Sequence, residues 1–148
     1  VNIRVKGGAY GAFAAFSRLG AVRFSSYRDP KMSETNGVFD GAPEAIANLD
    51  ISQRDLTKYI LGAINELDTP MTPSRKGDVS FRAYMSGLTT EMMQQERDEV
   101  LSTTVEELRA LKKLIGDALE SEYICAIGNA SQIEENSSMF KTTINIFK

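Results

Sequence analysis

The sequence contains no histidine, and its 148 residues include a single cysteine, Cys125. One cysteine excludes a disulfide within the chain and suits a reducing compartment. Because a nucleophilic thiol needs a base such as histidine beside it, the missing histidine argues against catalysis by Cys125. Cys125 lies in the apolar stretch of residues 123–127, so we expect it to be buried as a small hydrophobic side chain.

The chain also lacks an excess of positive charge and any long apolar run. Its 17 lysines and arginines are outnumbered by 20 aspartates and glutamates, and the net charge of −3 argues against a nucleic-acid partner. No apolar run approaches the roughly 20 residues that span a membrane, so we expect no membrane partner. The 42% apolar and 25% charged residues are typical of a soluble globular protein, and the length suits one domain with a buried core.

The most informative pattern lies at the start of the chain, where Arg4 precedes Tyr10 and three glycines surround the turn between them, Gly7, Gly8 and Gly11. Glycine lets the backbone bend sharply and approach another chain closely. Arginine and tyrosine supply hydrogen-bond donors that suit the carbonyl oxygens of a peptide. On its own the pattern is more typical of a plain turn, and its spacing does not match a phosphate or dinucleotide loop.

The stretch Arg4-Val-Lys-Gly-Gly-Ala-Tyr-Gly11 resembles a motif of the pitrilysin/insulinase family of zinc metallopeptidases and is most similar to its presequence protease branch. Three further stretches resemble that branch in the same order: Ser26-Tyr-Arg-Asp-Pro30, Thr72-Pro-Ser-Arg-Lys-Gly77 and Gln95-Glu-Arg-Asp-Glu-Val-Leu101. The resemblance implies a parent enzyme of four related domains that close around a chamber. Its first domain carries zinc on a His-x-x-Glu-His helix, and its last domain carries an arginine–tyrosine pair. This chain resembles that last domain and, without histidine, cannot contain the zinc motif.

The resemblance also implies roles for the residues of the opening motif. Tyr10 would stabilise the substrate carbonyl as it gains charge, beside the zinc of the parent's first domain. Arg4 would hold a backbone carbonyl of the substrate, and Gly7 and Gly8 would let the backbone pass close to the peptide. The chain itself is expected to bind no metal. Its implied partners are a peptide substrate and the N-terminal domains of the same polypeptide.

We therefore expect residues 1–148 to be a single substrate-gripping, C-terminal domain of a zinc-dependent endopeptidase that hydrolyses unstructured peptides. The sequence begins inside the motif, at Val1, which suits a fragment truncated at its N-terminus and inactive alone. The expected compartment is a bacterial cytoplasm, with an organelle as the alternative. Two other functions stay open: a non-catalytic structural subunit of the same fold, and an unrelated helical protein-interaction module.

Turn residues and hydrophobic periodicity predict the secondary structure. The expected elements are a hairpin of residues 10–16 and 21–27 around a turn at 17–20, a helix over 33–48 with an irregularity at Gly41 and Pro43, a helix over 52–67, a loop over 68–80, a helix over 89–101, a helix over 104–119, a strand over 123–127, a short helix over 131–136 and a strand over 142–147. This order predicts an α+β fold, an antiparallel or mixed sheet with helices packed on one face, and the fold of pitrilysin and mitochondrial processing peptidase domains agrees with it.

Local signals predict further details of these elements. Thr103 and Thr104, each followed three residues later by a glutamate, form overlapping capping boxes at the start of a helix. Apolar side chains at helical spacing predict two buried stripes. Their members are Leu56, Tyr59, Ile60, Ala63, Ile64 and Leu67 on one helix, and Val105, Leu108, Leu111, Leu114, Ile115, Ala118 and Leu119 on another. Arg75 and Lys76 are expected in a solvated loop, and residues 27–29 are expected to form an ion-paired corner after the hairpin.

Overall fold

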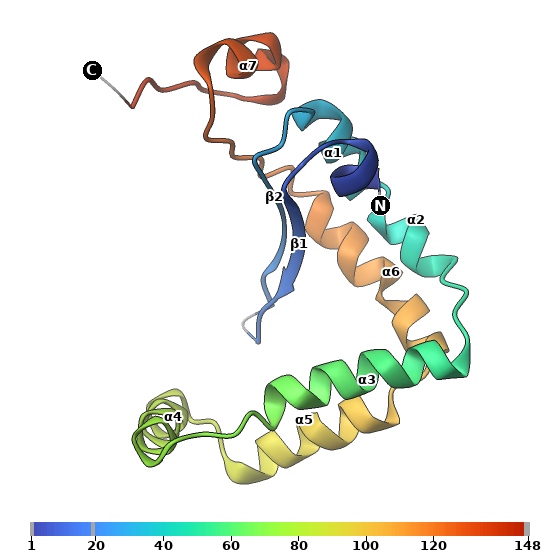
Figure 1. Ribbon diagram of the computed structural model, residues 1–148, viewed down its shortest axis with the longest axis vertical. Coiled ribbons are helices and arrows are strands. Elements are labelled where there is room, and N and C mark those ends of the chain that lie inside the picture. The colour runs from blue at the N-terminus through green and yellow to red at the C-terminus, as the bar shows by residue number, and fades with distance from the viewer. Residues whose placement is uncertain (1, 19, 147–148) are drawn as a thin grey trace. The chain divides into compact units, whose positions relative to one another are not determined.

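The computed structural model describes residues 2–18 and 20–146, and within them it shows an α+β fold (Figure 1). The elements are η1 (Asn2–Lys6), β1 (Gly11–Phe16), β2 (Val22–Tyr27), α1 (Met32–Asp40), α2 (Ala42–Ala47), α3 (Gln53–Leu67), α4 (Pro73–Ser86), α5 (Thr90–Ser102), α6 (Val105–Leu119), α7 (Ala130–Glu135) and η2 (Ser137–Met139). The described strands form one antiparallel pair, β1 with β2, which confirms the predicted fold class.

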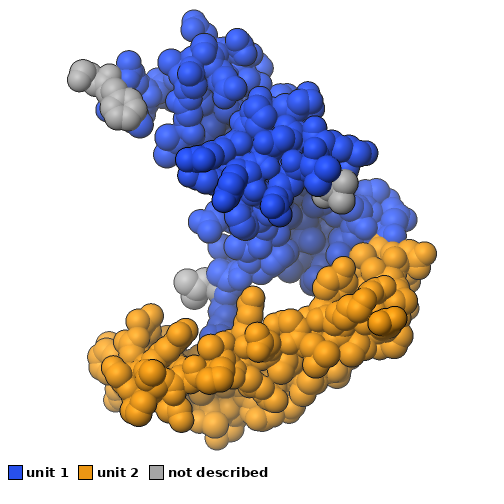
Figure 2. All heavy atoms as spheres, in the orientation of Figure 1, with its two compact units in different colours: residues 1–48, 110–148 blue, residues 49–109 orange. Residues whose placement is uncertain are grey.

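The chain divides into two compact units, which Figure 2 colours separately. The first unit combines Val1–Asn48 with Ala110–Lys148 and contains the hairpin. The second unit is Leu49–Arg109 and contains α3, α4 and α5. The candidate site of the opening motif therefore belongs entirely to the first unit.

The predicted hairpin is confirmed, and its register places Gly11 opposite Tyr27 and Phe16 opposite Val22. Its turn is closed by the Ser17 N–H, which donates to the Ala21 carbonyl at 2.9 Å. The Ala21 N–H in turn donates to the Ser17 hydroxyl oxygen at 3.1 Å. Residue 19 of the predicted turn lies outside the described residues.

Helix α1 packs on the hairpin through two aromatic rings. Phe24 of β2 stacks on Phe39 of α1 with centroids 5.4 Å apart and an angle of 29° between the rings. Elsewhere in the same unit, Lys112 of α6 pairs with Glu44 of α2 at 2.7 Å. The predicted helix over residues 33–48 is divided into α1 and α2 at Gly41, where the sequence indicated an irregularity.

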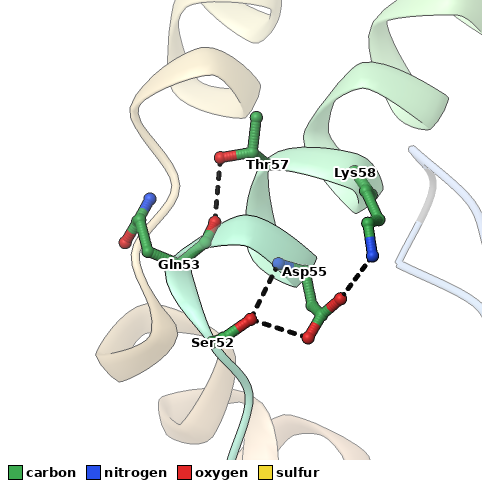
Figure 3. Close-up of polar contacts among 5 residues, drawn as sticks. All are labelled: Ser52, Gln53, Asp55, Thr57 and Lys58. Carbon is green, nitrogen blue, oxygen red and sulfur yellow. Dashed lines mark hydrogen bonds and ion pairs between the residues drawn. The ribbon is translucent and has the colours of Figure 1, made fainter.

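In the second unit, α3 and α5 lie side by side and antiparallel (Figure 1). Ser52 caps the start of α3: its hydroxyl oxygen accepts the Asp55 N–H at 3.2 Å (Figure 3). An ion pair between Asp68, just after α3, and Arg97 of α5 joins the two helices. The hydrogen bond that the Arg97 guanidinium donates to Asp68, and then the negative charge of Asp68, raise the pKa of Arg97.

The predicted loop over residues 68–80 is wrong, because a helix, α4, begins at Pro73. The Thr72 hydroxyl oxygen accepts the Arg75 N–H at 3.3 Å and caps this helix. Proline at the first helical position favours a helix start, since its missing N–H has no partner there in any helix. Arg75 and Lys76 consequently lie on the first turn of α4 and are exposed, instead of lying in a loop.

Two predicted strands are also wrong. Neither residues 123–127 nor residues 142–146 pair with another strand of the described chain, and Phe147 of the last predicted strand lies outside it. A short apolar run forms a strand only where a neighbouring strand accepts its backbone hydrogen bonds. Cys125 is exposed, contrary to prediction, because the segment around it is not covered.

The predicted apolar stripes of α3 and α6 are buried only in part. Leu56 is 2% exposed and Ile115 is 5% exposed, whereas Tyr59 is 65% exposed and Leu114 is 52% exposed. The other exposed apolar side chains include Phe81, Tyr84 and Ile127. Extensive apolar exposure of this kind marks surfaces that contact other protein. No helix in the described part of the chain is long and apolar enough to cross a membrane.

Candidate functional site at the hairpin base

Arg4 lies in the middle of η1, a single π-helical turn. The turn is closed by the Gly7 N–H, which donates to the Asn2 carbonyl at 2.8 Å, and by the Ala9 N–H, which donates to the Ile3 carbonyl at 3.2 Å. The Arg4 side chain is exposed. Such π-turns occur frequently at functional sites, and this one holds the backbone of Arg4 while its guanidinium faces solvent.

The two glycines that follow η1 have a conformational reason to be glycine. A Cβ atom at Gly7 would lie 2.4 Å from the Ile3 carbonyl oxygen, a distance that no side chain tolerates. Gly8 has a φ of +83°, in the left-handed region that ends many helices and favours glycine. Together they permit the turn that connects η1 to β1, and this turn lies between Arg4 and Tyr10 in the sequence.

Tyr10 is held by its backbone while its ring stays accessible. Its N–H donates to the Tyr27 carbonyl at 3.0 Å, which extends the hairpin ladder by one bond. The preceding residue, Ala9, is only 4% exposed and anchors the segment, whereas Tyr10 is 70% exposed. The hydroxyl of Tyr10 is thus presented on the surface from a backbone that is fixed on both sides.

The Tyr10 ring contacts two further side chains at the end of β2. It meets the Tyr27 ring edge-on, with centroids 5.9 Å apart and an angle of 86°. The Arg28 guanidinium carbon lies 6.0 Å from the Tyr10 centroid and 5.5 Å from the Tyr27 centroid. A corner is present at residues 27–29, but the ion pair predicted there is not found among the described residues: the Arg28 guanidinium lies over two aromatic rings instead.

Asp29 completes this corner. Its carboxylate oxygen Oδ1 accepts the Lys31 N–H at 2.9 Å. Burial opposes ionisation of Asp29, but hydrogen bonds from Thr35, the Lys31 backbone and Ser26 outweigh it and lower the pKa of Asp29 below its ordinary value of 3.8. The carboxylate is therefore ionised at neutral pH and ties the end of β2 to the start of α1.

Comparison with known proteins decides the family of this chain. The profile of the PreP C-terminal domain matches residues 1–130. The chain belongs to this family of presequence protease C-terminal domains. The assignment confirms the resemblance of the opening motif and excludes the alternative of an unrelated helical interaction module.

Three relatives show how far the similarity of this presequence protease C-terminal domain extends. It is 37% identical over 146 residues to Protein HypA of Clostridium perfringens, which covers 99% of this chain and 15% of the relative. It is 33% identical over 145 residues to Presequence protease 1, chloroplastic/mitochondrial, of Arabidopsis thaliana, with 95% of this chain and 13% of the relative covered. It is 34% identical over 132 residues to the mitochondrial presequence protease of Schizosaccharomyces pombe, with 88% and 13% covered. The chain thus spans only about a seventh of the length of these curated relatives.

The residues of this presequence protease C-terminal domain do not fit a zinc site. Protein zinc is held by cysteine, histidine and carboxylate side chains, usually three or four together. The sequence has no histidine, and the described residues contain no group of three potential ligands. The described residues therefore provide no ligand set of the kind that holds zinc in proteins.

The sequence indicated Arg4, Gly7, Gly8 and Tyr10, and it did not assign a role in the site to Tyr27 or Arg28. The hairpin register contains the missing signal, because pairing Gly11 with Tyr27 places Arg28 opposite Tyr10 one step further along. Counting outward from a correctly placed turn therefore identifies both neighbours of the Tyr10 ring.

Proposed function

We propose that residues 1–148 form one domain, the C-terminal substrate-gripping domain of a zinc-dependent endopeptidase related to the presequence proteases. The observation that carries this proposal is the pair of exposed donors, Arg4 and Tyr10, on a glycine-bounded turn at the base of the hairpin. The family assignment supports a peptidase-associated role, and the short span of this domain supports a parent chain that houses the rest of the enzyme.

The chemistry proposed for Tyr10 follows from its hydroxyl group. When a peptide bond is attacked, its carbonyl oxygen gains negative charge, and a donor already in place stabilises that charge. Loss of one such donor costs about 3–4 kcal/mol in acyl transfer. The backbone that carries this phenol is anchored by buried Ala9 and by the hydrogen bond to Tyr27, which suits a donor that must be in place before the reaction.

The role proposed for Arg4 is to hold a backbone carbonyl elsewhere on the same peptide. A guanidinium has several donors in a rigid plane and keeps its charge at any physiological pH. Gly7 and Gly8 present no side chain beside it, which leaves room for a peptide close to the backbone. The role of Gly7 and Gly8 in the turn does not depend on a substrate, so it is compatible with this proposed role of leaving room for a peptide.

The substrate class follows from what these donors recognise. Carbonyl groups in helices and sheets already accept hydrogen bonds within the folded protein. Only an extended, unstructured peptide offers its carbonyls freely to Arg4 and Tyr10. We therefore propose unstructured peptides as substrates, trapped in a chamber that this domain helps to wall.

The partners proposed for the domain are the N-terminal domains of the same polypeptide. Exposed apolar side chains such as Tyr84 (82%) and Ile127 (86%) are suited to contacts with them. Zinc would be bound by those domains and not by this one. We keep a bacterial cytoplasm as the proposed compartment and an organelle as the alternative, because a bacterial protein and organellar proteases are both among the relatives.

The test uses the full-length peptidase that contains this domain, with a fluorogenic unstructured peptide as substrate. Tyr10→Phe removes only the hydroxyl and should lower kcat by about 100-fold or more, with unchanged circular dichroism. Arg4→Gln should mainly raise KM, because it removes a contact to the bound peptide in both ground and transition states. The control is Tyr59→Phe, which makes the same change at an exposed tyrosine of α3. Full turnover by the Tyr10→Phe enzyme would remove Tyr10 from the mechanism.

A further inference from the structure

We propose that Arg28 and Tyr27 are positioning residues for Tyr10: they hold its ring so that the hydroxyl points at the substrate carbonyl. This inference rests on the function proposed above for Tyr10. It is carried by one cluster of three side chains, in which the Tyr27 ring meets the edge of the Tyr10 ring and the Arg28 guanidinium lies within 6.0 Å of both ring centroids.

Tyr10 needs such support because only its backbone is fixed by the hairpin. A side chain that is 70% exposed turns freely about its two torsions unless neighbours restrict it. A catalytic hydrogen bond depends on placement to within a fraction of an ångström, so residues that lock the rotamer contribute to rate. Contact with the Tyr27 ring restricts rotation of the Tyr10 ring. The Arg28 cation is attracted to the electron-rich faces of both rings.

The backbone at Arg28 supports a role beyond ordinary packing. Arg28 has a φ of +49°, in the left-handed region that residues other than glycine adopt only at a conformational cost. Strained positions of this kind concentrate at functional sites. A residue with an extended conformation here would continue β2, whereas the left-handed residue ends the strand just where its side chain lies over Tyr10 and Tyr27.

The corner that follows Arg28 is itself anchored. The Asp29 carboxylate accepts the Lys31 N–H at 2.9 Å, and Pro30 restricts the chain between them. The Pro30 ring also lies 3.5 Å from the position that a Cβ atom would take at Gly8. The corner therefore lies close to Gly8, in the turn that follows η1, and this proximity together with the Asp29 hydrogen bond restricts the segment that follows Arg28.

The test again uses the full-length peptidase with an unstructured peptide substrate. Arg28→Met keeps the length of the side chain and removes its charge, and it should lower kcat by about two- to fivefold while KM changes less than twofold. Arg28→Lys keeps a cation and should retain more of the activity. Tyr27→Phe keeps the ring and should be close to the unmutated enzyme, whereas Tyr27→Leu should lower kcat. Arg23→Met, the same change five residues earlier on β2, is the control and should leave kcat unchanged.

A double-mutant cycle separates positioning from plain stabilisation of the hairpin. If Arg28 acts through the Tyr10 hydroxyl, adding Arg28→Met to Tyr10→Phe should cause no further loss of kcat. A second loss as large as the first would overturn the proposal, because Arg28 would then act independently of that hydroxyl. Normal kcat in both Arg28→Met and Tyr27→Leu, alongside a strongly impaired Tyr10→Phe, would overturn this inference and leave the proposed function standing. If Arg28→Met fails to fold, the same cycle is measured with Arg28→Lys and with Tyr27→Leu, each alone and combined with Tyr10→Phe, and the loss of kcat is compared in the same way.

Discussion

Thr104 and Glu107 cap the start of α6 by exchanging hydrogen bonds: the Thr104 N–H donates to Glu107 Oε2 at 2.8 Å, and the Glu107 N–H donates to Thr104 Oγ1 at 3.2 Å. This reciprocal pair confirms one of the two predicted capping boxes. The other does not form, because the Thr103 hydroxyl donates to the Glu99 carbonyl of α5.

This capping box predicts a pH dependence of helix stability. The Thr104 N–H, and then the Thr104 hydroxyl, lower the pKa of Glu107 below its ordinary value of 4.5. A carboxyl group whose pKa is lower in the folded state stabilises that state fully above the ordinary value, and loses this contribution as pH falls through the lowered one. In a peptide of residues 103–120, circular dichroism should therefore show helicity lost below pH 4.5. Glu107→Gln should flatten that change; an identical titration would show that Glu107 does not contribute.

The start of α3 gives a second prediction, on helix capping. The Ser52 hydroxyl donates to Asp55 Oδ2 at 2.7 Å and its oxygen accepts the Asp55 N–H, while Lys58 holds the other carboxylate oxygen at 2.7 Å (Figure 3). Ser52→Ala removes the cap and should destabilise the helix by about 1 kcal/mol. Hydrogen exchange of α3 amides measures the loss. Ser52→Thr keeps a hydroxyl and should exchange almost as slowly as the unmutated protein; equal protection in Ser52→Ala would mean that the cap is unimportant.

These caps show which parts of the fold the sequence could predict. Capping boxes, the hairpin and most helices depend on neighbours within a few residues, so local patterns identified them. Residues 123–127 and 142–147 were predicted as strands from local patterns, but strands depend on partners distant in sequence. Residues 68–80 were predicted as a loop, although Thr72 and Pro73 within them start α4.

The candidate site, like the fold, could be predicted only in part from local sequence patterns. Arg4, Gly7, Gly8 and Tyr10 stand together in the first eleven residues, and their motif was enough to indicate them. The contribution of Arg28 depends on a left-handed backbone and on ring geometry, neither of which a local pattern records.

The glycines give a third prediction: replacement by alanine should destabilise the local structure at Gly7 and stabilise the helix at Gly62. Gly7→Ala would place a Cβ atom 2.4 Å from the Ile3 carbonyl oxygen and should open η1, seen as faster hydrogen exchange over residues 2–16. Gly62 lies inside α3 with open space around it, so Gly62→Ala should stabilise that helix by about 0.5–1 kcal/mol. Slower exchange in both variants would contradict the steric argument for Gly7.

Cys125 gives a fourth prediction, on thiol accessibility. The sequence favoured a buried thiol, whereas the structure exposes it. In the 148-residue chain, a thiol reagent such as 5,5′-dithiobis(2-nitrobenzoic acid) should react with one equivalent without denaturant, because Cys125 is exposed. The Cys125→Ser chain is the blank. A thiol that reacts only after urea is added would show that the segment of residues 123–127 is covered in solution.

The proposal that other domains of the parent bind the metal predicts how much zinc the isolated chain and the full-length peptidase retain. The chain has no histidine, and its described residues contain no cluster of three potential ligands, so it lacks the donor set that zinc requires. After chelation, incubation with zinc and dialysis, elemental analysis of the 148-residue chain should find far less than one zinc per molecule. The full-length peptidase treated in the same way should recover about one, because the proposed function assigns its zinc ligands to another domain. Tight, stoichiometric zinc in the isolated chain would require a ligand set in this domain and would contradict the assignment of metal binding to the rest of the parent.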